Sequence, residues 1–156
     1  MNLIFNIFYN YLILPLLYAA LRFAGLFNKK IRAGILGRKR VYEKLILSAT
    51  SINKSKKLIW FHSSSLGEFE QVKPITEKLK QQKDVNVLIT FFSPSGYENS
   101  IKYPFADLIA YIPFDTKANA EKFIAITNPT LAVIMRYDVW PNMIESLRNK
   151  KIPIFL

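Results

Sequence analysis

The hydrophobic positions of the C-terminal two thirds of the chain fall into short, continuously apolar runs. These runs are LIWFHS (58–63), VNVLITFF (85–92), DLIAYIPF (107–114), TLAVIM (130–135) and IPIFL (152–156). Apolar runs of this length, without polar alternation, are typical of strands that are buried on both faces of a parallel sheet. We therefore predict five strands.

The stretches between these runs have a different pattern. Apolar residues recur every three or four positions in three of them, which are predicted to be helices: 68–82, 116–127 and 140–150. SPSGYENS (93–100) instead has the composition of a turn. Strands that alternate with helices predict an α/β fold, with a Rossmann-like parallel sheet and helices on both faces.

The first 27 residues, MNLIFNIFYNYLILPLLYAALRFAGLF, are apolar and carry no charge before Arg22. An uncharged stretch of this length is about enough to cross a hydrocarbon core. Asn2, Asn6 and Asn10 would share one helical face, and Pro15 would kink the helix or remove a backbone hydrogen bond. A cleaved signal peptide is disfavoured because no basic region precedes the apolar run. A helix packed on a soluble core and a membrane anchor, spanning or interfacial, both remain open, and we favour the anchor.

The net charge of +11 is concentrated near the N-terminus. Residues 1–44 hold eight basic side chains against the single acid Glu43. A basic segment directly after an apolar helix is expected at an anionic membrane surface, whereas a nucleic-acid-binding protein more often spreads its charge over a folded face. We therefore predict an apolar membrane-anchor or interfacial helix (1–27), a basic juxtamembrane segment and linker (28–57), with 45–57 as the linker, and a Rossmann-like domain (58–156). Nucleic acid is not an expected partner.

Composition excludes several kinds of site. The chain has no cysteine and one histidine, so disulfides, thiolate nucleophiles and clusters of Cys or His ligands for a metal are excluded. Neither GxGxxG nor GxxxxGK[ST] occurs, so the usual signatures of dinucleotide and P-loop nucleotide sites are missing. Sites of these kinds are therefore not expected.

Three polar segments follow predicted strands, and ligands of open α/β sheets bind outside the carboxyl ends of the strands. They are HSSSLGE (62–68), SPSG (93–96) and RYDVWPN (136–142). Gly67 would allow a tight turn and a close approach of ligand to backbone. Glu68 is either a first-turn carboxylate that stabilises a helix N-terminus or a general base, and the residues alone favour the first role. Ser64 or Ser65 could cap that helix, and His62 is interpreted as an oriented strand-end residue, so a Ser-His triad is disfavoured.

Taken together, four segments resemble the N-terminal half of the 3-deoxy-D-manno-octulosonic acid (Kdo) transferases. They are WFHSSSLGEFEQVKPI, VLITFFSPSGYE, YIPFDTKANAEKFI and NPTLAVIMRYDVWPNMI, followed by KKIPIFL. The resemblance implies a GT-B glycosyltransferase, built from two Rossmann-like halves, at the cytoplasmic face of the inner membrane. Such enzymes of lipopolysaccharide assembly transfer Kdo from CMP-Kdo to the lipid A precursor (lipid IVA), with inversion and without a metal or cofactor.

The resemblance also implies roles for individual residues. Glu68 matches the glutamate that acts as catalytic base, and 58–156 would be the acceptor-binding domain. The expected acceptor-binding residues are Ser65, Gly67, Ser93, Ser95, Gly96, Asp138 and Asn142. Asp138 stands where the family usually has a glutamate, and Arg136 stands where many relatives have an acid.

The family's second domain, which supplies most contacts to CMP-Kdo, has no counterpart in these 156 residues. We therefore expect the chain alone to bind acceptor or membrane without transferring sugar. Two alternatives remain: a GT-B transferase with another sugar donor, and a non-catalytic membrane-docked binding module or truncated product.

Overall fold

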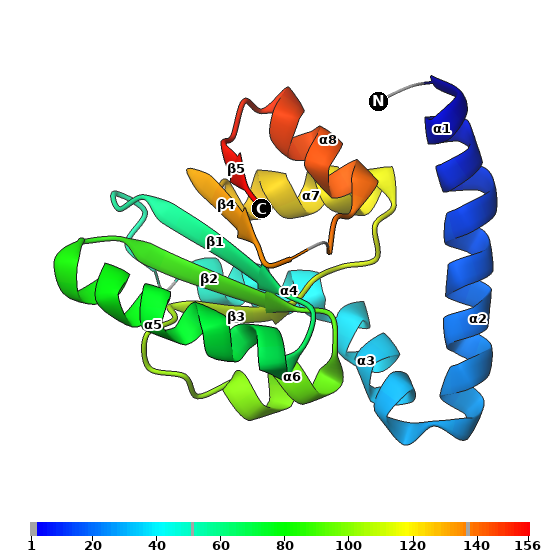
Figure 1. The fold of residues 1–156 in the computed structure, drawn as a ribbon, viewed down its shortest axis with the longest axis horizontal. Helices are drawn as coiled ribbons and strands as arrows, with labels where there is room; N and C mark the ends of the chain where they lie inside the picture. Colours follow the sequence, from blue (N-terminus) through cyan, green and yellow to red (C-terminus); the bar gives the residue numbers. More distant parts are fainter. Residues whose placement is uncertain (1–2, 51, 137) are drawn as a thin grey trace.

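The computed structural model describes residues 3–50, 52–136 and 138–156. Its centre is a five-stranded parallel sheet with the order β3-β2-β1-β4-β5 (Figure 1). The strands are β1 (Leu58–Ser63), β2 (Asn86–Phe91), β3 (Leu108–Tyr111), β4 (Leu131–Ile134) and β5 (Ile154–Phe155). All five predicted strands are present, and the predicted α/β class is confirmed.

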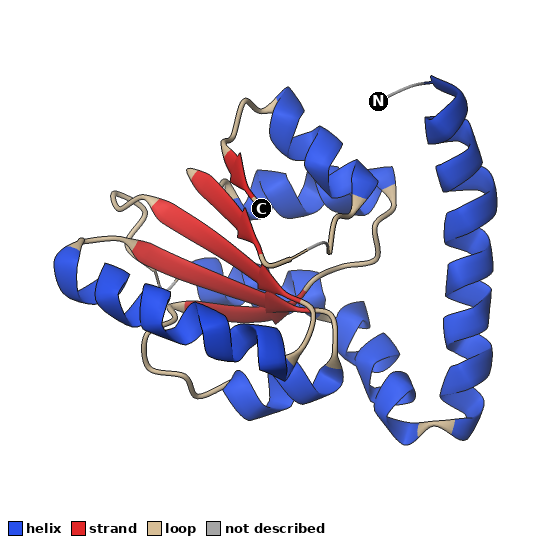
Figure 2. Ribbon diagram, viewed as in Figure 1, coloured by secondary structure: helices blue, strands red, loops and turns tan. Residues whose placement is uncertain are grey.

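Helices cover both faces of the sheet (Figure 2). On one face lie α5 (Leu66–Gln82) and α6 (Pro94–Ser100), and on the other lie α4 (Val41–Ala49), α7 (Lys117–Thr127) and α8 (Pro141–Asn149). Because β1 pairs with β2 on one side and with β4 on the other, the chain reverses its winding direction between β1 and β4. This reversal makes the carboxyl ends of β1 and β4 the switch point, where a ligand crevice is expected.

The core is built around β1 and β2 and the helices packed on them. Trp60 and Phe61 point to opposite faces of β1, and Phe69, Phe91 and Phe123 join them as fully buried aromatic residues. Burying a side chain of this size contributes about 1.5–3 kcal/mol. The continuous apolar runs in the sequence arise because both faces of the sheet are covered.

Two segments differ from the sequence interpretation. SPSGYENS is not a turn but forms the whole of α6 with its cap, because Ser93 caps the helix and Pro94 occupies its first turn, where proline is favoured. Residues 45–57 are a linker only in their later part. Val41 and Leu45 of α4 are buried in the core, so the helix belongs to the folded domain.

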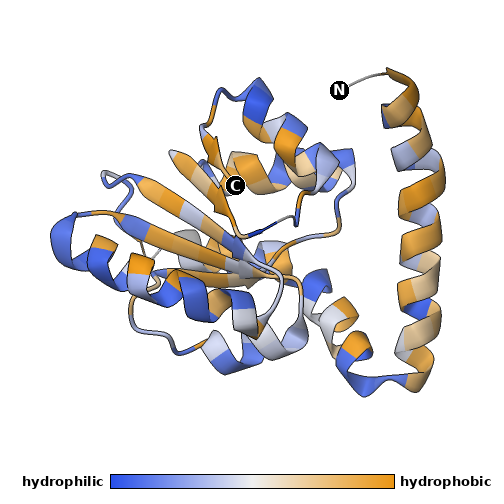
Figure 3. Ribbon diagram, viewed as in Figure 1, coloured by the Kyte–Doolittle hydropathy of each residue, from blue (hydrophilic) through white to orange (hydrophobic). Residues whose placement is uncertain are grey.

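The N-terminal apolar segment forms one long helix beside the domain, composed of α1 (Leu3–Phe8), the π-helical turn η1 (Tyr9–Ile13) and α2 (Leu14–Phe27). By length and composition, Leu3–Phe27 could cross a membrane. The helix is hydrophobic along most of its length (Figure 3). Most of its apolar side chains are exposed. Pro15 does not break the helix: it lies in the first turn of α2, directly after the π-helical turn.

The basic segment forms α3 (Lys29–Lys39), which Asn28 caps. Lys29 and Lys30 are exposed, whereas Arg38 is buried. The guanidinium of Arg38 donates to the backbone carbonyls of Ile112 and Phe92, which follow β3 and β2. Arg38 therefore fastens α3 to the sheet and is not available to a membrane surface.

Candidate functional site

Glu68 lies in the first turn of α5, directly beyond the carboxyl end of β1. Ser65 caps this helix, with its Oγ 3.4 Å from the Glu68 backbone nitrogen. The Glu68 carboxylate folds back over the helix end, where its Oε2 accepts a hydrogen bond from the Ser64 backbone N–H at 2.6 Å. The helix-end role expected of this carboxylate is therefore observed, and its role as a base stays a prediction.

The loop after β2 lies beside the loop after β1. The Ser93 backbone N–H donates to the Ser64 carbonyl at 2.8 Å, which joins the two loops. The Ser93 hydroxyl accepts from the Gly96 backbone N–H and lies 3.3 Å from the Ser95 hydroxyl. Three of the predicted residues, Ser93, Ser95 and Gly96, thus lie in the segment that contacts Ser64, the residue before Ser65.

Asp138 brings the third loop, which follows β4, to the same place. Its Oδ2 lies 2.6 Å from His62 Nε2 and accepts a hydrogen bond from the Ser64 hydroxyl. Burial acts to raise the pKa of Asp138, but the hydrogen bonds from His62 and Ser64 outweigh it and hold the pKa below its ordinary value. Asp138 is therefore ionised at neutral pH. We call Asp138, Ser64, Ser65, Glu68 and Ser93 together the switch-point cluster.

Ser64 joins the two carboxylates of this cluster, a role that the sequence analysis missed. Its backbone N–H serves Glu68 and its hydroxyl serves Asp138. Sequence analysis treated Ser64 only as an alternative helix cap, because three consecutive serines do not reveal which one faces the neighbouring loop.

The two glycines near the cluster differ in their surroundings. Gly67 does not have a positive φ, so the turn itself does not require glycine, and a Cβ at this position would meet nothing within 4 Å. At Gly96 a Cβ would lie 2.5 Å from Phe91 Cδ1. Gly67 thus leaves open space beside Glu68, whereas Gly96 lets α6 pack closely on β2.

Asn142 lies in a different cluster, which we call the helix junction. Asp115, after β3, accepts from the backbone N–H groups of Asn142 and Met143, both at 2.9 Å, and so caps the N-terminus of α8. The N-terminal helix enters the same cluster: Tyr9 donates to the Asp115 carboxylate at 3.0 Å, and Asn10 exchanges hydrogen bonds with the Asn142 side chain. Asn142 therefore stabilises the junction, and its contact with an acceptor stays a prediction.

Burial raises the pKa of Asp115 to about 6, and its hydrogen bonds from Asn142, Tyr9 and Met143 offset only part of this rise. The sequence analysis quoted Asp115 within YIPFD but assigned it no role. A signal was present, because Trp140 has no side chain suited to cap a helix and α8 therefore needs a remote acceptor.

The junction also explains the asparagine stripe of the first helix. Asn6 donates to Glu145 at 3.4 Å, and Asn10 reaches Asn142, so the polar side of this helix faces α8. Asn2 lies outside the described residues. The apolar side is left exposed, which is the arrangement of an amphipathic helix that docks on its own domain.

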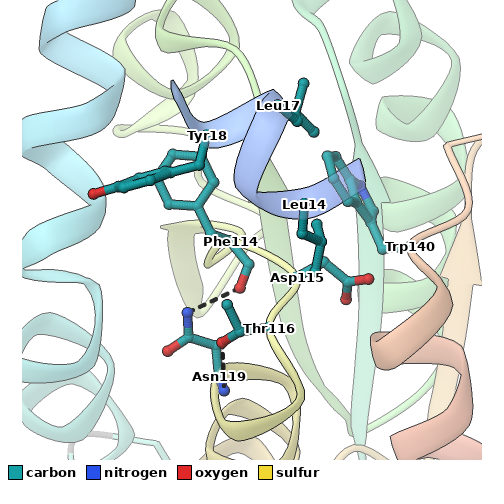
Figure 4. A pocket seen from close by; sticks show the side chains of 8 residues that line it. All are labelled: Leu14, Leu17, Tyr18, Phe114, Asp115, Thr116, Asn119 and Trp140. Atoms are coloured by element: carbon teal, nitrogen blue, oxygen red, sulfur yellow. Dashed lines mark hydrogen bonds between the residues drawn. The ribbon is translucent and has the colours of Figure 1, made fainter. Parts of the chain in front are cut away.

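An apolar cavity of about 270 Å³ opens between the N-terminal helix and the loop after β3 (Figure 4). Leu14, Leu17 and Tyr18 of α2 form one side, and the Tyr18 ring meets the Phe114 ring edge-on at 5.1 Å. Trp140, two residues after Asp138, also lines the cavity. The cavity therefore lies between the exposed apolar helix and the loop that carries Asp138. Within the described ranges, no group of three or more acidic or histidine side chains is arranged to hold a metal.

Comparison with known proteins supports one family. The family model of 3-deoxy-D-manno-octulosonic-acid transferase (kdotransferase) matches residues 39–156. A 3-deoxy-D-manno-octulosonic acid transferase of Haemophilus influenzae is 31% identical over 101 residues, which are 63% of this chain and 23% of the relative. That of Aquifex aeolicus is 29% identical over 103 residues, 65% of this chain and 29% of the relative.

A bifunctional glycosyltransferase/methyltransferase of Fusobacterium nucleatum is 29% identical over 107 residues, 66% of this chain and 17% of the relative. The chain thus spans less than a third of the length of each of these relatives. Its five-stranded fold and its match over residues 39–156, which include the whole switch-point cluster, show that the chain belongs to the 3-deoxy-D-manno-octulosonic-acid transferase family.

Proposed function

We propose that the chain is the acceptor-side domain of a glycosyltransferase that moves Kdo from CMP-Kdo to the lipid A precursor, lipid IVA, in lipopolysaccharide assembly. CMP-Kdo would be held mainly by a second domain. In the reaction, a hydroxyl of the acceptor attacks the anomeric carbon of Kdo. The new C–O bond forms as the bond to CMP breaks, and Glu68 takes the proton of the attacking hydroxyl.

The position of Glu68 carries this proposal. Its carboxylate lies at the switch point, where ligands of doubly wound sheets bind, and only its Oε2 is used in the hydrogen bonds of the described residues. Gly67 leaves open space directly beside it. A carboxylate with one oxygen held, next to an open glycine position, is suited to accept a proton from a bound hydroxyl.

The decisive experiment is Glu68→Gln in the full-length protein, with transfer from CMP-Kdo to lipid IVA as the assay. We expect a loss of about 100-fold to 10,000-fold, the range of general base catalysis. Glu70→Gln is the matched control, because Glu70 lies on the same helix but pairs with Lys73 on the exposed side. Equal melting temperatures would show that both variants fold. Full transfer by Glu68→Gln would contradict the base assignment.

A membrane-bound acceptor is supported by the N-terminal helix and by the cavity beside it. The exposed apolar face of the helix and the exposed cations Lys29 and Lys30 would lie against an anionic lipid surface, which we propose to be the cytoplasmic face of the inner membrane. An acyl chain of the acceptor could then enter the apolar cavity from the same side.

Vesicle flotation tests this orientation. Replacing Lys29 and Lys30 by Gln should weaken binding to anionic vesicles by about 2 kcal/mol, because each cation near such a surface contributes about 1 kcal/mol. Replacing Lys78 and Lys83, exposed near the far end of α5, is the control and should change little. Equal effects of the two pairs would contradict the proposed orientation.

The stereochemistry and the cofactor requirement are further parts of the proposal. We propose inversion at the anomeric carbon, without metal or cofactor, on the basis of the family resemblance. Nuclear magnetic resonance of the product would show the anomeric configuration, and transfer should be unchanged after treatment with a chelator.

A further inference from the structure

Three buried side chains beneath the switch-point cluster have no part in the proposed reaction. Trp60 and His62 lie on β1, Thr90 lies opposite His62 on β2, and all three are fully buried. Buried polar groups are costly unless each donor meets an acceptor. Their hydrogen bonds therefore fix where each hydrogen lies.

The hydrogen bonds run in one direction. The indole N–H of Trp60 can only donate, and it donates to Thr90 Oγ1 at 2.8 Å. Thr90 Oγ1 also lies 2.9 Å from His62 Nδ1, the one partner among the described residues to which its own hydrogen can be given. Thr90 therefore donates to Nδ1, which must be unprotonated.

The other ring nitrogen completes the chain. His62 Nε2 lies 2.6 Å from Asp138 Oδ2, and an ionised carboxylate only accepts hydrogen bonds. Nε2 must then carry the hydrogen. With a neutral imidazole protonated at Nε2, every donor from Trp60 to Asp138 has an acceptor. An imidazolium would leave the Thr90 hydrogen unpaired.

The hydrogen bond between His62 and Asp138 also fixes the position of Asp138. Asp138 belongs to the loop after β4, in which Arg136 has a left-handed backbone, and it is the His62 and Ser64 hydrogen bonds that tie this carboxylate to β1. Ser64 in turn binds Glu68 through its backbone N–H. The imidazole thus sets the position of one carboxylate relative to the other.

We infer that His62 is a positioning residue: held as the Nε2–H tautomer by Thr90 and Trp60, it orients Asp138 beside Glu68 to receive a hydroxyl group of the acceptor sugar. The inference rests on the proposed function for the identity of the acceptor. The tautomer and the hydrogen-bond chain do not depend on it.

The tautomer can be measured on the 156-residue chain in detergent micelles, by 15N nuclear magnetic resonance of the single histidine. We expect a protonated Nε2 and an unprotonated Nδ1 at neutral pH. Thr90→Ser keeps the hydroxyl and should preserve the Nδ1 shift, whereas Thr90→Val removes the donor and should move it. A protonated Nδ1 in the wild type, or an unchanged Nδ1 shift in Thr90→Val, would overturn the inference.

Two substitutions of His62 separate positioning from packing. In His62→Gln the amide nitrogen reaches the place of Nε2 and can still donate to Asp138, whereas in His62→Asn the shorter amide reaches only Thr90. In the full-length protein, we expect His62→Asn to lower kcat/KM for the acceptor about 100-fold, the cost of a misplacement of about 1 Å. His62→Gln should restore most of it, and equal losses in both variants would overturn the positioning role.

The carboxyl 13C titration of Asp138 provides a readout that a packing role would not move. Without the imidazole donor, the pKa of Asp138 should rise in His62→Asn and stay low in His62→Gln. No rise in His62→Asn would contradict the inference. If Glu68→Gln keeps full transfer while the tautomer is as expected, the proposed base fails and the orientation of Asp138 by His62 stands.

Discussion

Two aspartates, one in the switch-point cluster and one in the helix junction, show how far surroundings alone can separate identical side chains. Asp138 is 22% exposed and accepts from an imidazole and a hydroxyl, so its pKa lies below the ordinary value. Asp115 is 1% exposed, and burial raises its pKa to about 6 although three groups donate to it. Burial outweighs the hydrogen bonds at Asp115, whereas the hydrogen bonds outweigh burial at Asp138.

The difference in exposure between the two aspartates matches the role of the region in which each lies. At the junction, Asp115 joins α8 to the N-terminal helix through groups that belong to the chain itself, and its side chain is closed to solvent. In the switch-point cluster, Asp138 is charged and partly open to solvent. A carboxylate that is to meet a ligand must keep such an opening, whereas a helix cap need not.

The pH dependence of stability should separate the two aspartates most strongly. The pKa of Asp115 is raised from 3.8 to about 6, so between these values the folded chain keeps a proton that the unfolded chain has lost. The free energy of unfolding should therefore fall as pH rises from about 4 to about 6, by about 3 kcal/mol. Urea unfolding in mild detergent, followed by tryptophan fluorescence, measures this.

Asp138 should change the free energy of unfolding with pH in the opposite direction. Its lowered pKa makes a stabilising contribution that is present above the ordinary value and is lost as pH falls. Asp115→Asn removes the titrating group of the junction and should abolish the fall toward pH 6. If this variant kept the same pH dependence, the assignment of the window to Asp115 would be wrong.

Gly96→Ala should reduce stability by about 2 kcal/mol, the usual cost of inserting a methyl group into a packed core. The new Cβ would lie 2.5 Å from Phe91 Cδ1, and Phe91 is fully buried and has little room to move. Thermal unfolding measures the loss. An unchanged melting temperature would show that α6 can shift away from β2.

Tyr9→Phe tests the junction alone. It removes the hydroxyl that donates to Asp115 and should cost about 1 kcal/mol, the net contribution of a typical hydrogen bond. The pKa of Asp115 should rise further, because the Tyr9 hydrogen bond lowers it. Tyr11→Phe is the control, since Tyr11 is 81% exposed. Equal behaviour of the two variants would mean that the first helix is not docked through Tyr9.

Gly67→Ala should have the smallest effect on stability, within about 0.5 kcal/mol, because substitutions away from packed or strained positions rarely exceed this. In the proposed two-domain transferase, however, the methyl group would occupy the space beside Glu68 and should lower transfer. Normal transfer by this variant would show that the acceptor does not approach the backbone there.

The sequence was sufficient to predict the strands. Because helices cover both faces of the sheet, each strand is a continuous apolar run, whichever strands pair with it. The sequence was less informative for α6 and α4. Ser93 and Pro94 are favoured in turns and at helix starts alike. The apolar residues of α4 directly follow the basic end of α3, and the sequence analysis therefore assigned them to the basic segment and linker.

The candidate site was predicted in part for a similar reason. Residues that follow β1, β2 and β4 must meet at one edge of a parallel sheet, so Ser65, Glu68, Ser93 and Asp138 could be foreseen as neighbours. The link through Ser64 and the separate position of Asn142 could not, because both depend on how individual polar groups are oriented in the folded chain.

The sequence by itself determined the class of fold, the order of its elements and the long apolar N-terminal helix, since these follow from local periodicity and from the length of apolar runs. Tertiary structure alone decided which polar groups meet. His62 became the donor to Asp138, Arg38 turned inward to the sheet, and Asp115 became the cap of α8, although each partner is distant in the sequence. A hydrogen bond between two polar groups that are distant in the sequence forms through space, and periodicity along the chain carries no record of which groups pair.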